Sequence, residues 1–390
     1  MRNMKRLSIY ATASLLPLLV ASCASAGAAP ELDTGPADLS FPHLAERWDE
    51  AIPLGNGVLG GLLWNKDGRL RLAIDRIDLW DLRLQDEMHG PGHTFRRLYD
   101  LWKNDEYEQA IEFRNQLRAY PFPTKIPGAA LEWDISSLGD VESVRLLLQP
   151  AVCEVRWSSG AELQMFIHAE QDVGWFRFTG LDRELGPDLI APAYTVDSGT
   201  TVADQNRGSL TCLGYPDPDI ESDEREWSYR QETSLGNGYG VIVQWRQPSQ
   251  DVVEGSWSIA WRGSGEPADA RAPVVEALRR SWNRDLRDHI SWWAAYWDKS
   301  SVSLPDTVIE RHWYREMYKF GASTGHGSIP ISLQSVWTAD NGNLPPWAGD
   351  FHHDLNTQLS YWPAYTGNRL DQEHAFVDWL WRVRPEAELY

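Results

Sequence analysis

The hydrophobic period of this chain changes once, near residue 265, and the change limits the folds open to it. Before that point, short segments alternate apolar and polar residues with a period of two, which indicates half-buried β-strands. After it, apolar residues recur every three or four positions, which indicates amphipathic helices. Blocks of strands followed by blocks of helices predict a multidomain chain, β first and then α, rather than a parallel α/β sheet.

Residues 40–265 are expected to form a large β-sandwich. The clearest signal is a hairpin in which an Asn-Lys-Asp-Gly turn at 65–68 joins two strands. In the second strand, Leu70 and Leu72 are predicted to face the core, and Arg69 and Arg71 to face the other way.

Further strands are predicted by the same alternation, with a helical insertion near 94–120. Their expected ranges are Val144–Leu148, Val152–Trp157, Leu163–His168, Trp175–Thr179 and Tyr239–Arg246. Many short strands separated by turn residues are typical of a sandwich.

The helical part begins with a linker, expected at residues 270–300. Pro273–Asp298 lacks any further Gly or Pro and is predicted to be one amphipathic helix. A second helix is expected to begin at Pro305 and end at Gly321, and another spans Leu370–Trp381. Residues 301–390 are therefore expected to be the start of a helical domain that this sequence does not complete.

Charge and aromatic content limit the classes of molecule that the chain is expected to bind. The chain carries 36 basic and 56 acidic residues, a net charge of −20, and such a field repels the phosphate backbone of nucleic acid. A neutral glycan is compatible with it. The 21 Trp residues allow two interpretations, bulk for large cores or flat faces that stack on sugar rings.

Residues 1–30 are predicted to be an export signal and the start of a tether. Arg2, Lys5 and Arg6 precede the short apolar run Leu15–Val20, and small residues then precede Cys23. Lipidation of Cys23 would anchor the mature protein to a bacterial membrane, at the outer membrane or cell surface. Alternatively, cleavage after the small residues that follow would release a soluble periplasmic protein.

No cofactor and no metal are expected. The sequence has no Cys/His spacing of a zinc site, no phosphate loop and no dinucleotide fingerprint. His352, His353 and Asp354 are adjacent, and adjacent side chains rarely point at one ion. Cys153 and Cys212 leave two alternatives open, a disulfide in an oxidising compartment or two separate buried thiols.

Two segments carry a resemblance to a known family. The first is Glu-Ala-Ile-Pro-Leu-Gly-Asn-Gly-Val-Leu-Gly-Gly at 50–61, followed by Ile-Asp-Arg-Ile-Asp-Leu-Trp at 74–80. The second is Leu-Gln-Ser-Val-Trp at 333–337, followed at 345–363 by Pro-Pro-Trp and the run His-His-Asp-Leu-Asn-Thr-Gln-Leu-Ser-Tyr-Trp-Pro. Their order and spacing resemble glycoside hydrolase family 95, which includes α-L-fucosidases and α-L-galactosidases.

The resemblance implies a supersandwich-like N-terminal domain followed by an (α/α)6 catalytic barrel and an inverting glycosidase. It implies that His352 contacts the sugar, and that Asp354 and Asn356 orient and activate the catalytic water. Trp337, Trp347 and Trp362 belong to the same stretch and are expected to contact substrate.

Asp354 departs from the family, which has Asn at this position. Asn offers both a donor and an acceptor, whereas an ionised Asp only accepts. Asp354 would therefore polarise water itself, shift substrate preference, or mark a lineage with altered chemistry. The structural alternative is a polar loop in which Asp354 caps the following helix.

The general acid and the base of the family are expected beyond Tyr390, so the chain as given is predicted to hydrolyse little or nothing. The alternative function is a non-catalytic glycan-binding surface lipoprotein. A third possibility is an exported sandwich protein with no role in sugar chemistry.

Overall fold

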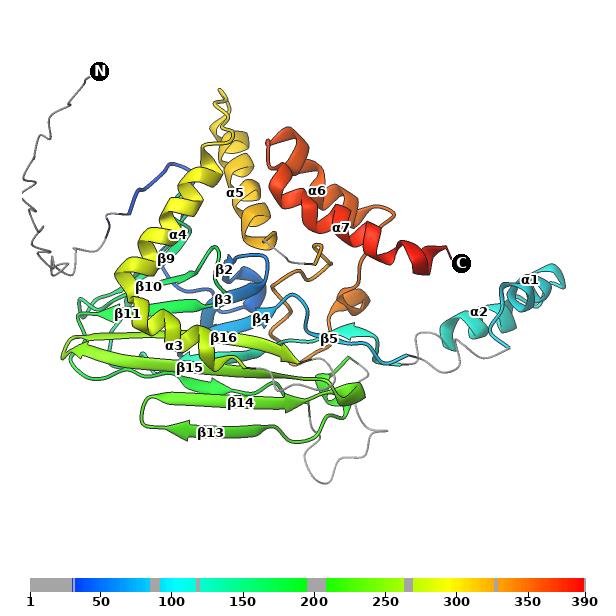
Figure 1. Cartoon of the computed structure of the whole chain (residues 1–390), viewed down its shortest axis with the longest axis horizontal. Helices are drawn as coiled ribbons and strands as arrows, with labels where there is room; N and C mark the ends of the chain where they lie inside the picture. The colour runs from blue at the N-terminus through cyan, green and yellow to red at the C-terminus, as the bar shows by residue number, and fades with distance from the viewer. Residues whose placement is uncertain are drawn as a thin grey trace, which may run out of the picture.

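A computed structural model of the chain describes residues 30, 32–84, 92–116, 120–194, 208–262, 269–325 and 329–388. In these residues a two-sheet β part is followed by helices (Figure 1). The predicted order of β first and then α is confirmed; the supersandwich and (α/α)6 assignments remain predictions. The predicted signal at 1–30 and Cys23 lie outside the described residues, apart from residue 30 itself.

The larger sheet has nine antiparallel strands, and Cα register pairs each strand with its neighbour. In spatial order these are β1 (Leu39–Phe41), β8 (Val141–Leu147), β9 (Val152–Trp157), β10 (Glu162–Ile167), β11 (Gly174–Thr179), β16 (Val252–Arg262), β15 (Gly238–Ser249), β14 (Glu226–Glu232) and β13 (Asp219–Asp223). Every strand expected from 144 onward lies in this sheet.

The smaller sheet has five strands and carries the predicted hairpin, β3–β4, in register from Leu59 opposite Arg76 to Lys66 opposite Arg69. In spatial order its strands are β12 (Asp188–Ile190), β7 (Ala129–Trp133), β4 (Arg69–Arg76), β3 (Leu59–Lys66) and β2 (Ile52–Gly55). A two-stranded ribbon pairs β5 (Trp80–Asp81) with β6 (Thr124–Lys125), and an isolated antiparallel bridge joins Ser209 to Asn343.

One hydrophobic core lies between the two sheets. Leu70 and Leu72 of β4 are buried, as their alternation predicted. Trp133 of β7 is fully buried, and its ring lies 5.1 Å from Phe176 and 5.9 Å from Phe178, both on β11 of the other sheet. Contacts of this kind hold the sheets face to face.

The face of β4 that bears Arg71 is not open to water as the alternation suggested. Arg71 is 7% exposed because a later loop covers it, and its guanidinium contacts Glu132 and Asp340 at 2.6 Å each. Burial lowers the pKa of Arg71, but the two carboxylates more than offset this, and the net pKa is raised.

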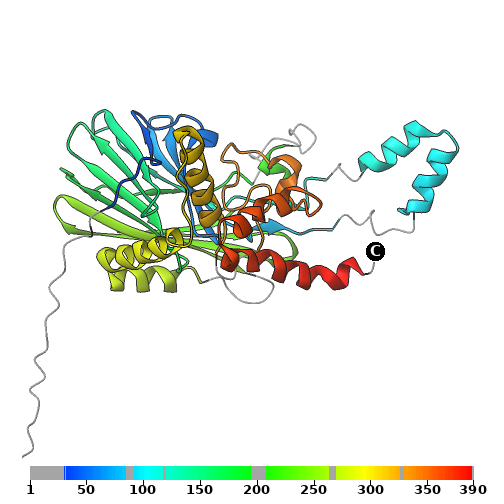
Figure 2. The same cartoon turned by 90° about the horizontal axis from the view of Figure 1, so that it is seen from above.

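Two short helices interrupt the strands at the predicted insertion: α1 (Phe95–Lys103) and α2 (Tyr107–Gln116) form a hairpin that stands away from the sheets (Figure 2). Thr94 caps α1 by accepting a hydrogen bond from the amide of Arg97 at 3.2 Å.

The predicted linker helix is two helices, α3 (Arg271–Arg280) and α4 (Trp282–Trp297). The break falls at Ser281, whose φ of +83° cannot continue an α-helix. It turns Trp282 onto the larger sheet, where its ring lies 5.0 Å from Phe166 and 5.9 Å from Trp175.

Three helices follow: α5 (Thr307–Ser323), α6 (Asn356–Thr366) and α7 (Leu370–Ala387), with α6 and α7 side by side (Figure 1). The helix predicted to begin at Pro305 begins two residues later, at Thr307, and Asp306 caps it by accepting from the amides of Val308 and Ile309. The predicted stop at Gly321 is wrong, because the helix continues to Ser323. Gly321 instead permits α5 to pack closely on α4, since a Cβ there would meet Tyr296 at 2.9 Å.

The described residues also contain short 3-10 segments: η1 (Trp48–Glu50), η4 (Leu210–Leu213), η5 (Ser234–Gly236) and η6 (Pro346–Gly349). No helix of the described residues is long and apolar enough to cross a bilayer. Cys153 is buried in β9 and is not joined to Cys212 by a disulfide; Cys212 is half-buried, so the alternative of two buried thiols holds for Cys153 alone.

Candidate functional site

The segment between α5 and α6 carries the second motif, and the β part holds it at several points. The indole N–H of Trp337 donates to the carbonyl of Leu54 on β2 at 2.8 Å. The carboxylate of Asp340 accepts hydrogen bonds from the guanidinium of Arg71 and from the indole N–H of Trp64. The segment is therefore built on the smaller sheet rather than hanging free in solvent.

The glycines of the first motif make room for this contact. A Cβ on Gly60 would lie 1.8 Å from the carbonyl oxygen of Val336, so only Gly fits there. The amide of Gly57, with φ +83°, donates to the carbonyl of Ala322 at the end of α5 at 2.8 Å. Asn56, which precedes Gly57, is buried and donates from its side chain to the carbonyl of His168 at 2.9 Å. The two motifs thus meet in space, far apart as they are in sequence.

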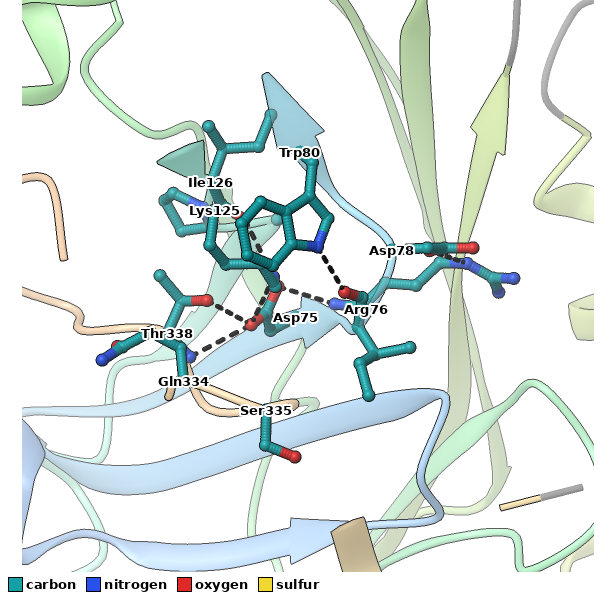
Figure 3. Close-up of polar contacts among 12 residues, drawn as sticks. Asp75, Arg76, Asp78, Trp80, Lys125, Ile126, Gln334, Ser335 and Thr338 are labelled. Carbon is teal, nitrogen blue, oxygen red and sulfur yellow. Dashed lines mark hydrogen bonds and ion pairs between the residues drawn. The ribbon is translucent and has the colours of Figure 1, made fainter. Parts of the chain in front are cut away.

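A buried ion pair lies where the two motifs join (Figure 3). The ammonium of Lys125, fully buried on β6, contacts Asp75 of β4 at 2.7 and 3.0 Å. Asp75 also accepts from the amide and the hydroxyl of Thr338, at 3.0 and 2.6 Å. Burial lowers the pKa of Lys125, and the carboxylate of Asp75 opposes that shift.

A cavity of about 430 Å³ opens between this segment and the first turns of α6. Apolar side chains and the indole of Trp337 form part of its wall. The polar lining is uncharged throughout the described residues: Ser323, Ser332, Gln334, Ser335, Asn356, Thr357 and Ser360. Hydroxyl and amide groups of this kind hydrogen-bond neutral polyhydroxylated ligands without a charge partner.

Internal contacts fix the shape of the cavity. Ser332 accepts from the amide of Ser335 at 3.1 Å, and the amide of Ile331 donates to the hydroxyl of Tyr361 on α6 at 3.1 Å. Gln334 accepts from the amide of Ala339 at 3.2 Å. The amide nitrogen of the Gln334 side chain makes no hydrogen bond to another described residue, so a donor remains for a ligand.

Two of the six predicted site residues line the cavity. Trp337 forms part of its wall, and Asn356 is the first residue of α6. The Asn356 side chain makes no hydrogen bond with another residue of the described part, so its donor and acceptor are both available to a ligand. The helix N-terminus adds partial positive charge at the same place.

Trp347, His352, Asp354 and Trp362 do not line it among the described residues. Trp347 and Trp362 are 68% and 61% exposed. His352 contacts Asp350 at 2.7 Å, and its ring lies edge-on to Trp347 at 6.0 Å. His352 and Trp347 thus lie together, outside the cavity lining.

His353 faces inward, unlike His352. It accepts from the indole N–H of Trp379 on α7 at 3.1 Å and stacks on Phe351 and Phe376. Phe351 in turn stacks on Trp80 of the first motif at 5.5 Å. Burial lowers the pKa of His353, which favours the neutral ring that this packing needs.

Asp354 is exposed and does not cap α6, so the structural alternative of an Asp N-cap is wrong. The cap is Leu355, which has no side-chain acceptor. Asp354 therefore lies one residue before the N-cap, and its carboxylate makes no hydrogen bond to another described residue.

No three side chains of His, Cys, Asp and Glu come close enough to hold a metal ion within the described ranges. What the site offers is a neutral, hydrogen-bonding cavity with an indole wall. An exposed carboxylate and an imidazole lie nearby, on the chain that leads into α6.

Sequence reasoning missed the residues that support the cavity from below. Asp75 lies in the first motif, but no feature of the sequence marked it as a buried hydrogen-bond acceptor. Lys125 gave no signal, since a lone Lys is almost always exposed. Thr338 follows the motif Trp and only its neighbours in space reveal its role. Gln334 lies in the second motif, where no function was predicted for it.

Comparison with known proteins falls on the same segment. Residues 310–389 match the family described as "Glycosyl hydrolase family 95 catalytic domain", which includes all six predicted site residues. The chain is also 23% identical over 127 residues to "Probable alpha-fucosidase A" of Aspergillus niger. That similarity covers 27% of this chain and 16% of the relative, so the chain spans only a small part of the relative's length.

Proposed function

We propose, from the premise that the chain is a glycoside hydrolase family 95-like protein, that its cavity binds a terminal fucose-like or galactose-like sugar of a glycan. The observation that carries this proposal is the coincidence of two independent facts. The catalytic-domain match covers the segment 331–360, and the cavity in that segment is lined by uncharged hydrogen-bonding groups.

In this proposal the neutral groups bind the sugar and the charged ones act on water. Gln334 and Asn356 bond sugar hydroxyls, and Trp337 offers an apolar wall. His352 contacts the sugar at the mouth, where Trp347 and Trp362 add aromatic surface. Asp354 and Asn356 orient the water that attacks the anomeric carbon with inversion.

Inverting hydrolysis needs a carboxylic acid and a carboxylate base placed about 6.5–9.5 Å apart across the sugar. No carboxylate lines the cavity in the described part of the chain. We therefore propose that the chain as given binds the sugar and hydrolyses it slowly or not at all. The same observation favours the second candidate, a non-catalytic glycan-binding surface protein.

Hydrolysis of aryl α-L-fucoside and aryl α-L-galactoside by purified protein tests the enzymatic part. Proton NMR of the first product anomer reports inversion or retention. We expect turnover at or near the uncatalysed rate. Robust turnover would show that the described residues contain a working acid and base.

The Asp354→Asn variant tests the departure from the family. Asp354 is exposed, so the substitution is expected to leave the thermal midpoint within about 1 °C. A gain of turnover in the variant would assign the weak activity to the loss of the Asn amide rather than to the lack of an acid and a base at the cavity. Equal turnover in both proteins would remove Asp354 from the mechanism.

Export is a separate proposal: Cys23 is lipidated and the protein resides in the periplasm or on the cell surface. Labelled palmitate fed to cells that express the protein should appear in it, and a Cys23→Ala variant should lose the label. A soluble, unlabelled product in both would favour cleavage after the small residues that follow.

A further inference from the structure

We propose that Asp75 and Lys125, which belong to the β part, are positioning residues for the cavity. Their buried ion pair fixes Thr338, and through it the loop that presents Gln334 and Trp337 to the ligand. The inference rests on the proposed sugar-binding function and deepens it, because it assigns part of the binding site to residues that lie 200 positions or more before the second motif.

The Asp75 carboxylate is saturated with donors. It receives the Lys125 ammonium, the amide and hydroxyl of Thr338, and the amide of Arg76 at 2.7 Å (Figure 3). Lys125 also donates to the carbonyl of Ile126 at 3.2 Å. Asp75 is 4% exposed and Lys125 is fully buried. Water therefore cannot replace any of these bonds when one is removed.

The ion pair and its neighbour Thr124 contact the segment between α5 and α6 at two points, which we call its two arms. On one arm, Thr338 precedes Ala339, whose amide donates to the side-chain oxygen of Gln334. On the other arm, the hydroxyl of Thr124, next to Lys125, donates to the carbonyl of Ala348 at 3.4 Å.

Gly349 shows how closely the two arms approach. A Cβ there would lie 2.9 Å from both Gln334 and Lys125. Gly349 thus packs against both Gln334 and Lys125, and the side-chain oxygen of Gln334 is held by Ala339, which leaves its side-chain nitrogen to meet a ligand.

Stability alone does not account for such a pair. Two apolar side chains of similar size would fill the same space without the cost of desolvating two charges. An ion pair with directed hydrogen bonds specifies one arrangement of its neighbours, which an apolar contact does not. The Asp75 acceptors point to Thr338, so the arrangement specified is that of the cavity loop.

Two matched variants separate positioning from folding. Thr338→Val removes the hydroxyl bonded to Asp75 and keeps the shape of the side chain. Thr338→Ser keeps the hydroxyl and removes a buried methyl group. Both lower the thermal midpoint by a few degrees, but only Thr338→Val disturbs the hydrogen bond to the pair.

Calorimetric titration with methyl α-L-fucoside is the first readout. We expect Thr338→Val to weaken binding about tenfold and Thr338→Ser to bind within about twofold of the parent. The double variant Asp75→Leu/Lys125→Met should also bind weakly, and its midpoint should fall by several degrees, because the buried amides of Arg76 and Thr338 lose their acceptor. Parental affinity in Thr338→Val, or losses that simply follow the midpoint in both Thr338 variants, would overturn the positioning role.

Amide hydrogen exchange supplies a readout that needs no ligand. In Thr338→Val the amides of residues 334–339 are expected to exchange at least about tenfold faster, with those of β9 and β10 unchanged. Unchanged exchange in 334–339 would overturn the inference. If the parent bound no fucoside while exchange behaved as expected, the sugar-binding proposal would fail and the positioning of the loop would stand.

Discussion

Tryptophan plays different parts in the two halves of the molecule. In the β part and the linker helices that pack on it, six Trp side chains are less than 2% exposed: Trp133, Trp157, Trp175, Trp257, Trp282 and Trp293. In the second motif and the last two helices, Trp347, Trp362 and Trp381 are between 61% and 71% exposed. The buried indoles fit the interpretation of Trp as bulk for a large core, and the exposed ones leave stacking on sugar rings as a proposal.

The difference teaches that residue type alone does not locate function here. Buried indoles fill the space between sheets, where their area removes water from the core. The three exposed indoles lie on η6, α6 and α7 instead. We therefore expect substitutions in the first region to change stability and those in the second to change binding.

The largest expected effect is in the core. Trp133→Ala should lower the free energy of unfolding by about 3–5 kcal/mol, because a fully buried indole leaves a cavity between the sheets. Trp362→Ala should change it by at most about 0.5 kcal/mol. Urea unfolding followed by circular dichroism measures both, and a costly Trp362→Ala would break the distinction between the two regions.

The next effect lies on the boundary between the regions. Arg71→Met should cost about 3 kcal/mol, because it leaves Asp340 without a cation and Glu132 with Arg69 alone. Arg384→Met, which loses an exposed pair with Glu388, should have no measurable cost. Equal midpoints for the two variants in urea would show that the bridge between sheet and loop is not needed.

The third effect is a pH dependence confined to the interface of α4 with the larger sheet. Burial lowers the pKa of His289 to about 3 and lowers that of His168 as well. Below the ordinary pKa of about 6.5 the unfolded chain binds protons that the folded chain does not. Stability is therefore complete above that pH and falls as the pH drops toward 3.

Between pH 6.5 and 4.5 the expected loss from His289 is about 2–3 kcal/mol. Urea midpoints measured across this range test it. His289→Phe should flatten the slope, and His312→Gln, on an exposed side chain of α5, should leave it as in the parent. A slope unchanged by His289→Phe would assign the titration to another group.

Local patterns predicted the elements well and their partners poorly. The alternation of Leu70 and Leu72 located β4 and its buried face, and Asp306 marked the start of α5. The break at Ser281 had no signal, because it serves the packing of Trp282 on the sheet. The hydrophobic period of a segment does not reveal which distant segment it packs against.

The candidate site divides in the same way. Motif spacing located the segment, and two of its six named residues line the cavity. Lys125 could not be predicted, since its burial depends on a carboxylate 50 positions earlier and on Thr338 more than 200 positions later. Buried charge is stable only with its partners, so no property of the residue alone reveals it.

The central claim is that this cavity binds a neutral sugar, and titration of methyl α-L-fucoside into the purified protein tests it most directly. We predict saturable binding with a Kd on the order of 1 mM, weakened about tenfold in Asn356→Ala and unchanged in Gln358→Ala, which lies on α6 outside the cavity lining. No binding of α-L-fucoside or α-L-galactoside, or binding that Asn356→Ala leaves unchanged, would contradict the account.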